Sequence, residues 1–265
     1  MSKTMRLMAL ATVFAVVLVA CGDGSGGSTT TTPGAQLELI TPGTLTVCTE
    51  TPFFPMEFVD ATHPTGYNGF DIELSAAIAD ELGLDIVVSD IPFDLITSGV
   101  AFESNDCDMG AASITIRADR EEDIDFSTPY FLSEQSLLVS VSSGITSLED
   151  TVGHEIAVQT GTTGHYFAED EGPEGMVIVE YPDADSPWLA LEGGQVSGFM
   201  SDLVATQAWS ATRSDFTVVE TFSPEEYGLA TKDSPNLLAA VNAALAKFQT
   251  DGTYQEIFDK WFLPE

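Results

Sequence analysis

Hydrophobic and polar residues along this chain follow two alternating spacings. Over residues 45–48 they alternate one by one, as in a half-buried strand. Residues 71–82 have helical spacing, and their apolar face contains Ile72, Ala76, Ala79 and Leu82. Gly83 ends this helix, and residues 85–89 follow as the next strand. Strands that alternate with helices predict an α/β fold with a doubly wound sheet.

The stretch over 109–116 is apolar but carries two hydroxyl groups, those of Ser113 and Thr115. A short apolar run bounded by turn signals predicts a buried strand. Hydroxyl groups at the end of a strand, free N–H groups at the next helical turn and the guanidinium of Arg120 are groups that bind a carboxylate. The stretch therefore predicts a small carboxylate site.

We expect different environments for the two arginines that follow this strand. Arg117 faces Asp119 and Glu121, and an exposed arginine beside acids usually forms an ion pair of little energetic consequence. We expect Arg117 to be of this kind. For Arg120 a surface ion pair and a ligand contact remain open on these residues alone.

Acidic residues dominate the composition, with 42 Asp and Glu against 8 Lys and Arg and a formal net charge of −34. Such a surface repels nucleic acid and anionic lipid headgroups, so we expect neither as a partner. Hydrophobic residues make up 44% of the 265 residues, which is typical of a globular protein with ample core. One large domain or two small ones fit this length.

Residues 1–20 have the features of a secretory signal peptide, a positive start followed by an apolar run too short to be a stable membrane span. The small residues before Cys21 resemble the bacterial lipobox, which implies cleavage before Cys21 and lipid attachment to its sulfur. The alternative is an ordinary signal peptide with a chance cysteine. Residues 21–40 are predicted to form a flexible linker, so that the folded part is lipid-anchored to the outer face of the cell membrane.

Two further cysteines, Cys48 and Cys107, lie in the predicted core. An exported protein with two such cysteines suggests a disulfide. If their strands are parallel neighbours, however, the offset along the strands can exceed the reach of a bridge, and both possibilities stay open. The three histidines show no metal-ligand spacing with either cysteine, so we expect no metal site and no cofactor.

Several segments together resemble a known family. The sequence Gly-Phe-Asp-Ile-Glu-Leu from Gly69, with the apolar face that follows it, resembles the signature of bacterial extracellular solute-binding protein family 3, the polar amino acid family. Thr115 with Arg120 and then residues 124–130 resemble a second segment of that family. The resemblance extends over residues 45–262. It implies a monomeric substrate-binding lipoprotein, not an enzyme, that delivers a free amino acid to the permease subunits of an ABC importer.

The resemblance also implies the architecture. Members have a type II periplasmic-binding-protein-like fold, in which two doubly wound lobes are joined by two hinge strands. We expect the first crossing at residues 136–141 and the second at 222–230. The lobes are then predicted as follows: 41–137 and 223–265 form the first, and 138–222 the second.

The main ligand contacts are carried over from the family's motifs. The ligand's carboxylate is expected to meet Arg120, Thr115 and N–H groups near Ser113 on one lobe and Thr163 on the other. Thr163 stands at a predicted helix start after a glycine turn, a second place suited to an anion. The ligand's ammonium is expected to meet Asp202. The alternative for Asp202 is a helix N-cap.

Four more residues are expected around the ligand's side chain. Gln159 could add a polar contact, and Phe53 and Phe93 could flank the side chain by stacking or apolar contact. Glu50 stands where family members that take basic ligands have an acid, and it could pair with a cationic tip. The alternatives are lobe core for the two phenylalanines and a solvated loop acid for Glu50.

An enzyme on the same fold is the main competing interpretation. Cyclohexadienyl and arogenate dehydratases share this architecture and need a positioned acid in the cleft. Glu50 or Asp202 could fill that role. The lipobox and the linker favour delivery to a permease over catalysis.

Overall fold

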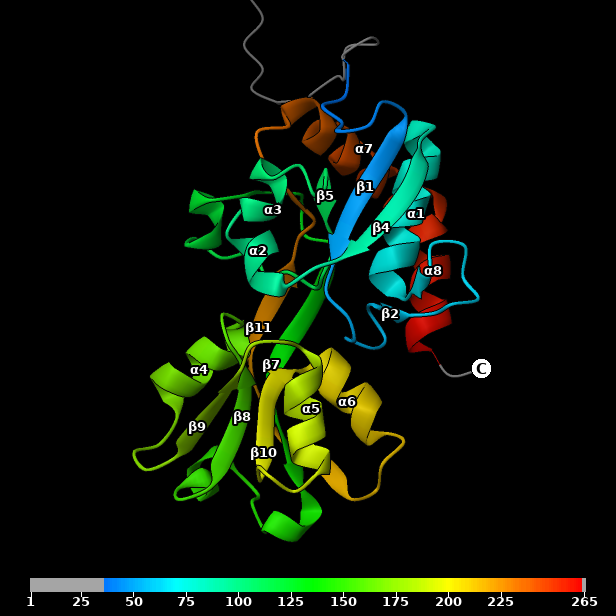
Figure 1. Cartoon of the computed structure of the whole chain (residues 1–265). Coiled ribbons are helices and arrows are strands. Elements are labelled where there is room, and N and C mark those ends of the chain that lie inside the picture. The colour runs from blue at the N-terminus through cyan, green and yellow to red at the C-terminus, as the bar shows by residue number, and fades with distance from the viewer. Residues whose placement is uncertain (1–35, 264–265) are drawn as a thin grey trace, which may run out of the picture. The chain divides into compact units, whose positions relative to one another are not determined.

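The computed structural model describes residues 36–263. The predicted signal peptide, Cys21 and the first part of the predicted linker lie outside the described residues. Two five-stranded sheets organise the described part of the chain (Figure 1). The first sheet contains β1 Thr44–Thr49, β4 Asp85–Asp90, β5 Met109–Gly110, β6 Asp125–Phe126 and β12 Ala230–Thr231.

The first sheet has the strand order β4-β1-β5-β12-β6. Its strands β4, β1 and β5 are parallel, as the alternation of strands and helices predicts. The strand β12 runs antiparallel to β5 and β6, because it enters this sheet only after the chain has returned from the second one. The sheet is therefore mixed, with its parallel part at one side.

The second sheet has the order β11-β7-β10-β8-β9. Its members are β7 Phe131–Ser140, β8 Glu155–Gln159, β9 Val177–Tyr181, β10 Gly198–Asp202 and β11 Phe216–Tyr227. The strand β8 is parallel to β9 and β10, whereas β7 is antiparallel to β10 and β11. A two-stranded sheet of β2 Phe58–Val59 and β3 Tyr67–Asn68 stands apart from both.

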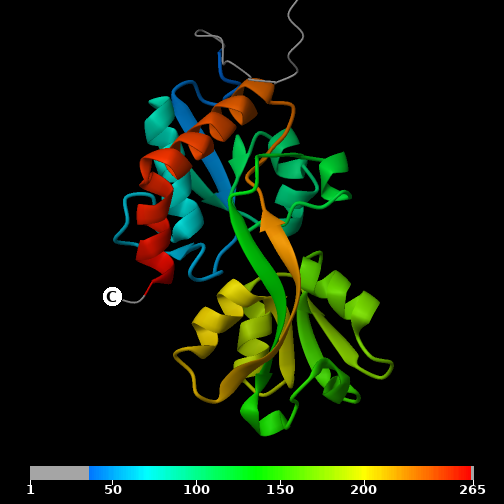
Figure 2. The same cartoon turned by 180° about the vertical axis from the view of Figure 1, so that it is seen from behind.

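The long strands β7 and β11 connect the two sheets. They pair antiparallel from Phe131 opposite Tyr227 to Ser140 opposite Phe216. Figure 2 shows them side by side between the upper and the lower part of the described chain. Both start earlier than the sequence predicts, at Phe131 and Phe216, because partly apolar residues before the expected crossings also pair.

Helices cover both faces of the first sheet. On one face Leu45 and Val47 of β1 pack in a core with the helices α1 Phe70–Leu82, α7 Pro235–Asp251 and α8 Thr253–Phe262. On the other face Cys48 packs with the short helices α2 Phe93–Thr97 and α3 Val100–Glu103. This division follows from the alternation of side chains along a strand.

The second sheet is covered in the same way. Leu137 and Val139 of β7 face a core shared with α4 Thr163–Glu171. Leu138 faces the opposite core, shared with α5 Asp185–Glu192 and α6 Leu203–Ser210. Three short 3-10 turns complete the described elements: η1 Arg120–Glu122, η2 Val141–Ser143 and η3 Leu148–Thr151.

The predicted strand over 109–116 is wrong beyond its first two residues. Only Met109 and Gly110 pair as β5, and Ser113 has a left-handed φ of 51°. The segment is nevertheless buried, because its backbone N–H groups find hydrogen-bond partners outside the first sheet. The N–H of Ser113 donates to Asp71 at 2.9 Å, and that of Ile116 donates to the carbonyl of Glu226 at 2.8 Å.

A disulfide joins Cys48 and Cys107, whose Cα atoms are 5.5 Å apart. The strand of Cys48 and the strand that follows Cys107 are parallel neighbours, with Cys48 opposite Gly110. The offset does not prevent the bridge, because Cys107 lies in the irregular turn before β5 and not in the extended strand. The structure therefore contains the disulfide that the sequence could neither predict nor exclude.

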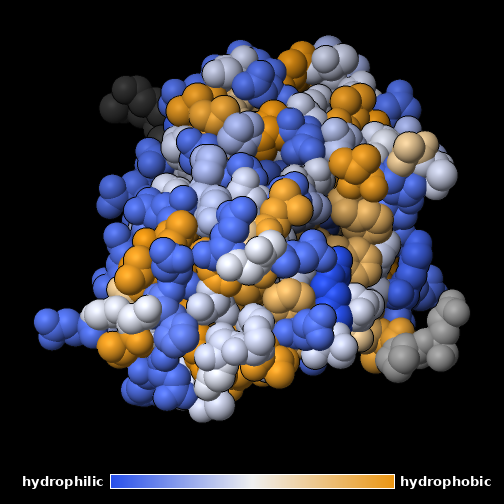
Figure 3. Space-filling model, turned by 60° about the horizontal axis from the view of Figure 1, so that its bottom comes forward, coloured by the Kyte–Doolittle hydropathy of each residue, from blue (hydrophilic) through white to orange (hydrophobic). Residues whose placement is uncertain are grey.

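Hydrophilic residues cover much of the face drawn in Figure 3, and hydrophobic residues form small groups between them. This pattern fits the acidic composition, with 42 Asp and Glu in the chain. Over residues 36–263 no helix combines the length and the apolar composition that crossing a membrane requires.

Candidate functional site

One cavity is lined by residues from the loops of both sheets. Its empty space is about 490 Å³, counted with its opening to solvent. All nine residues predicted to contact a ligand line this cavity: Glu50, Phe53, Phe93, Ser113, Thr115, Arg120, Gln159, Thr163 and Asp202. The sequence therefore predicted which side chains the fold brings together.

The cavity lies at the carboxyl ends of strands from both sheets. Glu50 directly follows β1, whereas Gln159 and Asp202 are the last residues of β8 and β10. Parallel strands of α/β sheets present their loops at this edge, where ligands bind. Gly164, in the first turn of α4, lets the helix start approach β10. A Cβ atom there would stand 2.7 Å from the carbonyl oxygen of Met200.

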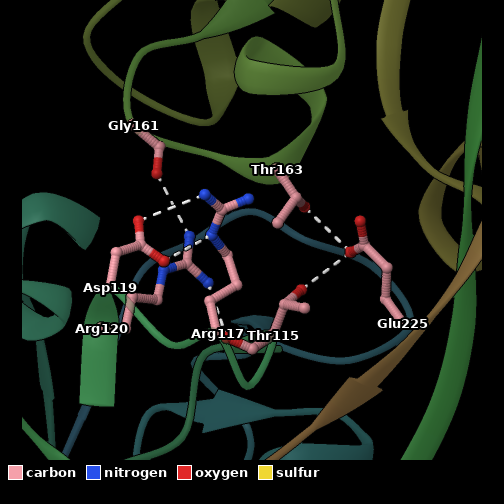
Figure 4. A network of polar contacts seen from close by, with 7 residues as sticks. All are labelled: Thr115, Arg117, Asp119, Arg120, Gly161, Thr163 and Glu225. Atoms are coloured by element: carbon pink, nitrogen blue, oxygen red, sulfur yellow. Dashed lines mark hydrogen bonds and ion pairs between the residues drawn. The ribbon is translucent and has the colours of Figure 1, made fainter. Parts of the chain in front are cut away.

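Arg120 is buried, and its hydrogen bonds connect two segments of the cavity wall. Its guanidinium donates to the carbonyl of Thr115 at 2.9 Å and to the carbonyl of Gly161 at 3.1 Å (Figure 4). The same group lies 5.1 Å from the ring centre of Phe93. Burial and then the nearby charge of Arg117 lower the pKa of Arg120 to about 10, so the side chain remains cationic at neutral pH.

Arg117 has the environment that the sequence predicted. It forms an exposed ion pair with Asp119, with 2.9 Å between Nε and Oδ1 (Figure 4). Its guanidinium also stands 4.5 Å from the ring centre of Tyr166 on α4, a contact that the sequence did not indicate. Arg117 is not among the residues that line the cavity.

Asp202 is buried at the N-terminal end of α6. It occupies the N-cap position, but its side chain makes no capping hydrogen bond. Instead its carboxylate accepts hydrogen bonds from the amide of Gln135 and the hydroxyl of Tyr227. Burial and then the negative charge of Glu225 raise the pKa of Asp202 above its ordinary range.

Glu225 of β11 links the two walls of the cavity. One of its oxygens accepts from the hydroxyl of Thr115 at 2.8 Å and from that of Thr163 at 2.9 Å (Figure 4). The amide of Gln135 is 3.2 Å from the same oxygen. Sequence analysis missed Glu225 and Gln135. The signal for Gln135 was a polar residue at an inward-facing position of a strand that continues into Leu137 and Val139.

Glu50 is buried and is not the solvated loop acid that was the alternative. It accepts from the amide of Gln159 at 2.5 Å and from the N–H of Phe93 at 3.2 Å. Burial raises the pKa of Glu50 to about 7, although these two hydrogen bonds act in the opposite direction.

Glu57 is a third buried acid in the cavity wall, and sequence analysis missed it. Its carboxyl group is 3.3 Å from the hydroxyl of Ser113, and burial followed by the charge of Asp71 raises its pKa well above the ordinary value. Glu57 stands in a loop among apolar residues, between Met56 and Phe58, which was the available signal. An acid so placed is commonly exposed, so burial could not be read from the sequence.

The two phenylalanines combine both predicted roles. Phe93 belongs to the core beneath α2, and Phe53 packs against cores of both sheets. Each also lines the cavity. The remaining lining residues, which the sequence did not single out, are small, hydroxylated or aromatic: Ala112, Thr162, Ala184, Phe199 and Ser201.

A family model for bacterial extracellular solute-binding proteins, family 3, matches residues 45–264. The chain belongs to this family. The match covers both sheets and all the residues that line the cavity. The predicted family and its two-lobed α/β fold are therefore confirmed.

Individual relatives agree with the family. The putative ABC transporter arginine-binding protein 2 of Escherichia coli K12 is 28% identical over 236 residues, 86% of this chain and 95% of that protein. The structure of an ancestral arginine-binding protein bound to glutamine is 34% identical, with a TM-score of 0.76 over 84% of this chain and 99% of that one. A third, also ancestral, is an amino acid-binding protein described as a precursor of cyclohexadienyl dehydratase. It is 31% identical, with a TM-score of 0.75 over 83% of this chain and 96% of that one.

These relatives decide between the two functions that the sequence proposed. Each is described as a binding protein, including the precursor of the dehydratase. The chain is the substrate-binding protein of an amino acid ABC transporter, and its relatives are amino acid-binding proteins and not enzymes, as the sequence predicted.

Proposed function

We propose that this family 3 protein clamps an α-amino acid with a cationic side chain between Arg120 and Asp202. The observation that carries the proposal is that a buried guanidinium and a buried carboxylate line the same cavity. Arg120 belongs to the segment after β5, and Asp202 ends β10 in the other sheet. A zwitterion between them uses both charges at once.

The carboxylate end of the ligand is assigned to Arg120 and to the start of α4. A guanidinium has five N–H donors, and the two hydrogen bonds from Arg120 to carbonyl groups leave donors for a ligand. The first turn of α4, from Thr163, adds N–H groups without partners inside the helix and the positive end of its dipole. Both features favour an anion at this wall.

The side-chain end of the ligand is assigned to Glu50 and Glu57. Acids outnumber cations among the described residues that line the cavity. The acids are Glu50, Glu57 and Asp202, and the cation is Arg120. A ligand with one negative and two positive charges has a net charge of +1 and offsets part of this acidic excess. Phe53 and Phe93 provide apolar surface for the methylene groups of a long side chain.

Closure of the two lobes would complete the site. Two bonds already join the lobes across the cavity, from Gln159 to Glu50 and from Arg120 to the carbonyl of Gly161. We assign the first lobe to residues 41–137 and 223–265 and the second to 138–222, with β7 and β11 as the hinge. The closed form is what the permease subunits would receive.

A thermal-shift screen of the full chain tests this assignment. Its ligands are L-arginine, L-lysine, L-ornithine, L-glutamine and L-glutamate. Because a ligand that binds only the folded state raises the melting temperature, the three cationic amino acids should give the largest shifts and L-glutamate the smallest. A larger shift with L-glutamate would refute the cationic class. No shift with any of the five would refute the clamp.

The anchoring of the protein is part of the same proposal. We assign residues 1–20 to a lipoprotein signal peptide, with Cys21 lipidated and residues 21–40 as the linker to the outer face of the cell membrane. Support comes from the residues before Cys21 and from a family that is extracellular. Mass spectrometry of the protein from a bacterial membrane should find acyl chains on Cys21, and a Cys21→Ala variant should be released. An unmodified Cys21 would contradict the assignment.

A further inference from the structure

The hydroxyl groups of Thr115 and Thr163 both donate a hydrogen bond within the protein. Each gives its single proton to the same oxygen of Glu225, at 2.8 and 2.9 Å (Figure 4). A threonine hydroxyl has one donor and two acceptor lone pairs. With the proton engaged, each hydroxyl can only accept a hydrogen bond from a ligand in the cavity.

We propose that Glu225 is a positioning residue that fixes both hydroxyl groups as acceptors for the α-ammonium group of the ligand. The inference rests on the proposed amino acid clamp and deepens it. It changes the role that the sequence suggested for Thr115 and Thr163, because a hydroxyl without a free proton cannot donate to the ligand's carboxylate. The carboxylate is then left to Arg120 and the backbone N–H groups of α4.

The neighbouring groups fit an ammonium ion. The amide of Gln135 donates to Asp202, to the hydroxyl oxygen of Thr163 at 2.9 Å and toward Glu225 at 3.2 Å, so these groups form one network. Thr115, Thr163 and Asp202 all line the cavity. An ammonium group carries three N–H donors, and these three acceptors match that number.

A competing role for Glu225 has the opposite consequence. Its carboxylate could act as a substitute for the ligand's carboxylate and compete for the two hydroxyl groups. Removing its charge would then strengthen ligand binding. If Glu225 instead fixes the hydroxyl groups as acceptors, the same change weakens binding, and only for ligands that carry an α-ammonium group. The sign of the effect therefore separates the two roles.

The test uses Glu225→Gln in the full chain, with Glu226→Gln as the matched control. Glu226 is the next residue on β11 and is exposed, whereas Glu225 is half-buried in the network. A glutamine can offer an N–H to a hydroxyl, which then turns and donates toward the cavity. The probes are two pairs that differ only in the α-ammonium group: L-arginine with 5-guanidinopentanoate, and L-glutamine with glutaramate.

We expect Glu225→Gln to weaken binding of the amino acids by about tenfold, the effect of one hydrogen bond to a charged group, and to leave the des-amino analogues unaffected. Calorimetry should show the ratio of the two affinities falling about tenfold, with no change in Glu226→Gln. Unchanged or tighter binding of the amino acids would overturn the role of Glu225. Equal weakening of both members of a pair would show a merely structural role and would also overturn it.

A second variant guards against a general disturbance of β11. Thr115→Val keeps the shape of the side chain and removes the hydroxyl, so it should also reduce the affinity ratio. In the double variant the two changes should not add, because both act on one hydrogen-bonded unit. Additive effects would contradict the inference. A wild-type chain that binds neither L-arginine nor L-glutamine would instead refute the proposed function.

Discussion

The side-chain amide of Gln159 donates to the carboxylate of Glu50 at 2.5 Å. Glu50 follows β1 of the first sheet, and Gln159 ends β8 of the second, so this bond spans the cavity. Burial raises the pKa of Glu50 to about 7. The charge of Glu50, and with it the attraction for a cationic ligand, therefore changes near neutral pH.

The stability of the ligand-free protein should fall as the pH rises. The folded-state pKa of Glu50, about 7, lies above its ordinary value of 4.5, so the folded state holds the proton more tightly than the unfolded state. Stability from this group is present at low pH and is lost between about 4.5 and 7. Glu57, Asp71 and Asp202 act in the same direction, since burial raises each of their pKa values.

Melting temperatures measured from pH 5.5 to 8 check this expectation. The wild type should melt at a lower temperature at pH 8, and Glu50→Gln should show a smaller decrease because the glutamine does not titrate. Ordinary surface acids are already ionised throughout this range, so they contribute little to the difference. A melting temperature that rises with pH would contradict the assigned environment of Glu50.

Binding of L-arginine should respond to pH in the opposite sense. The ionised form of Glu50 attracts the guanidinium of the ligand, so affinity should increase as the pH passes about 7. Binding should also release protons, which calorimetry in buffers of different ionisation enthalpy detects. Glu50→Gln should flatten the pH dependence and reduce proton release. An affinity that stays constant from pH 5.5 to 8 would show that Glu50 does not face the ligand.

The Cys48–Cys107 disulfide should stabilise the first sheet. It closes a loop with a sequence separation of 59 residues, for which the chain-entropy model gives about 4 kcal/mol. The double variant Cys48→Ser with Cys107→Ser should lose a free energy of unfolding of that order in urea titrations. Reductant should destabilise the wild type and leave the variant unchanged. Equal stability of the two proteins would contradict a formed disulfide.

Gly69, just before α1, should tolerate no side chain. It has a φ of 128°, and a Cβ atom there would stand 2.2 Å from the carbonyl oxygen of Met56. Gly43 also has a positive φ, 85°, but nothing lies within 4 Å of its Cβ position. Gly43→Ala should therefore cost about 1 kcal/mol or somewhat more from backbone strain alone, and Gly69→Ala considerably more. Urea unfolding of both variants measures the difference, and equal losses would exclude the clash.

The fold could be predicted where local patterns determine it. The apolar spacing of residues 71–82 and the glycine after them indicate α1, and Gly83 indeed adopts a left-handed φ of 69°. The segment over 109–116 could not be predicted in this way. Its burial depends on Asp71 and on the backbone of Glu226, which are remote in sequence, so an apolar run was mistaken for a strand.

The site could be predicted for residues at the ends of strands and at helix starts, such as Asp202 and Thr163. Residues that influence the site only through hydrogen bonds to these side chains could not be predicted. Glu225, Gln135 and Tyr227 join the network only because β7 and β11 pair beside β10, and this pairing is a property of the tertiary fold. Glu57 was missed because burial of an acid contradicts its usual exposure.

The most direct test of the clamp is a calorimetric titration of Arg120→Ala with L-arginine. Arg213→Ala is the matched control, because Arg213 stacks on Trp209 outside the cavity. Leaving the ligand's carboxylate desolvated and unpaired costs roughly 2–5 kcal/mol, so Arg120→Ala should weaken binding by about a hundredfold or more while Arg213→Ala leaves it unchanged. A loss below about threefold in Arg120→Ala would contradict the account that one lobe holds the carboxylate through Arg120.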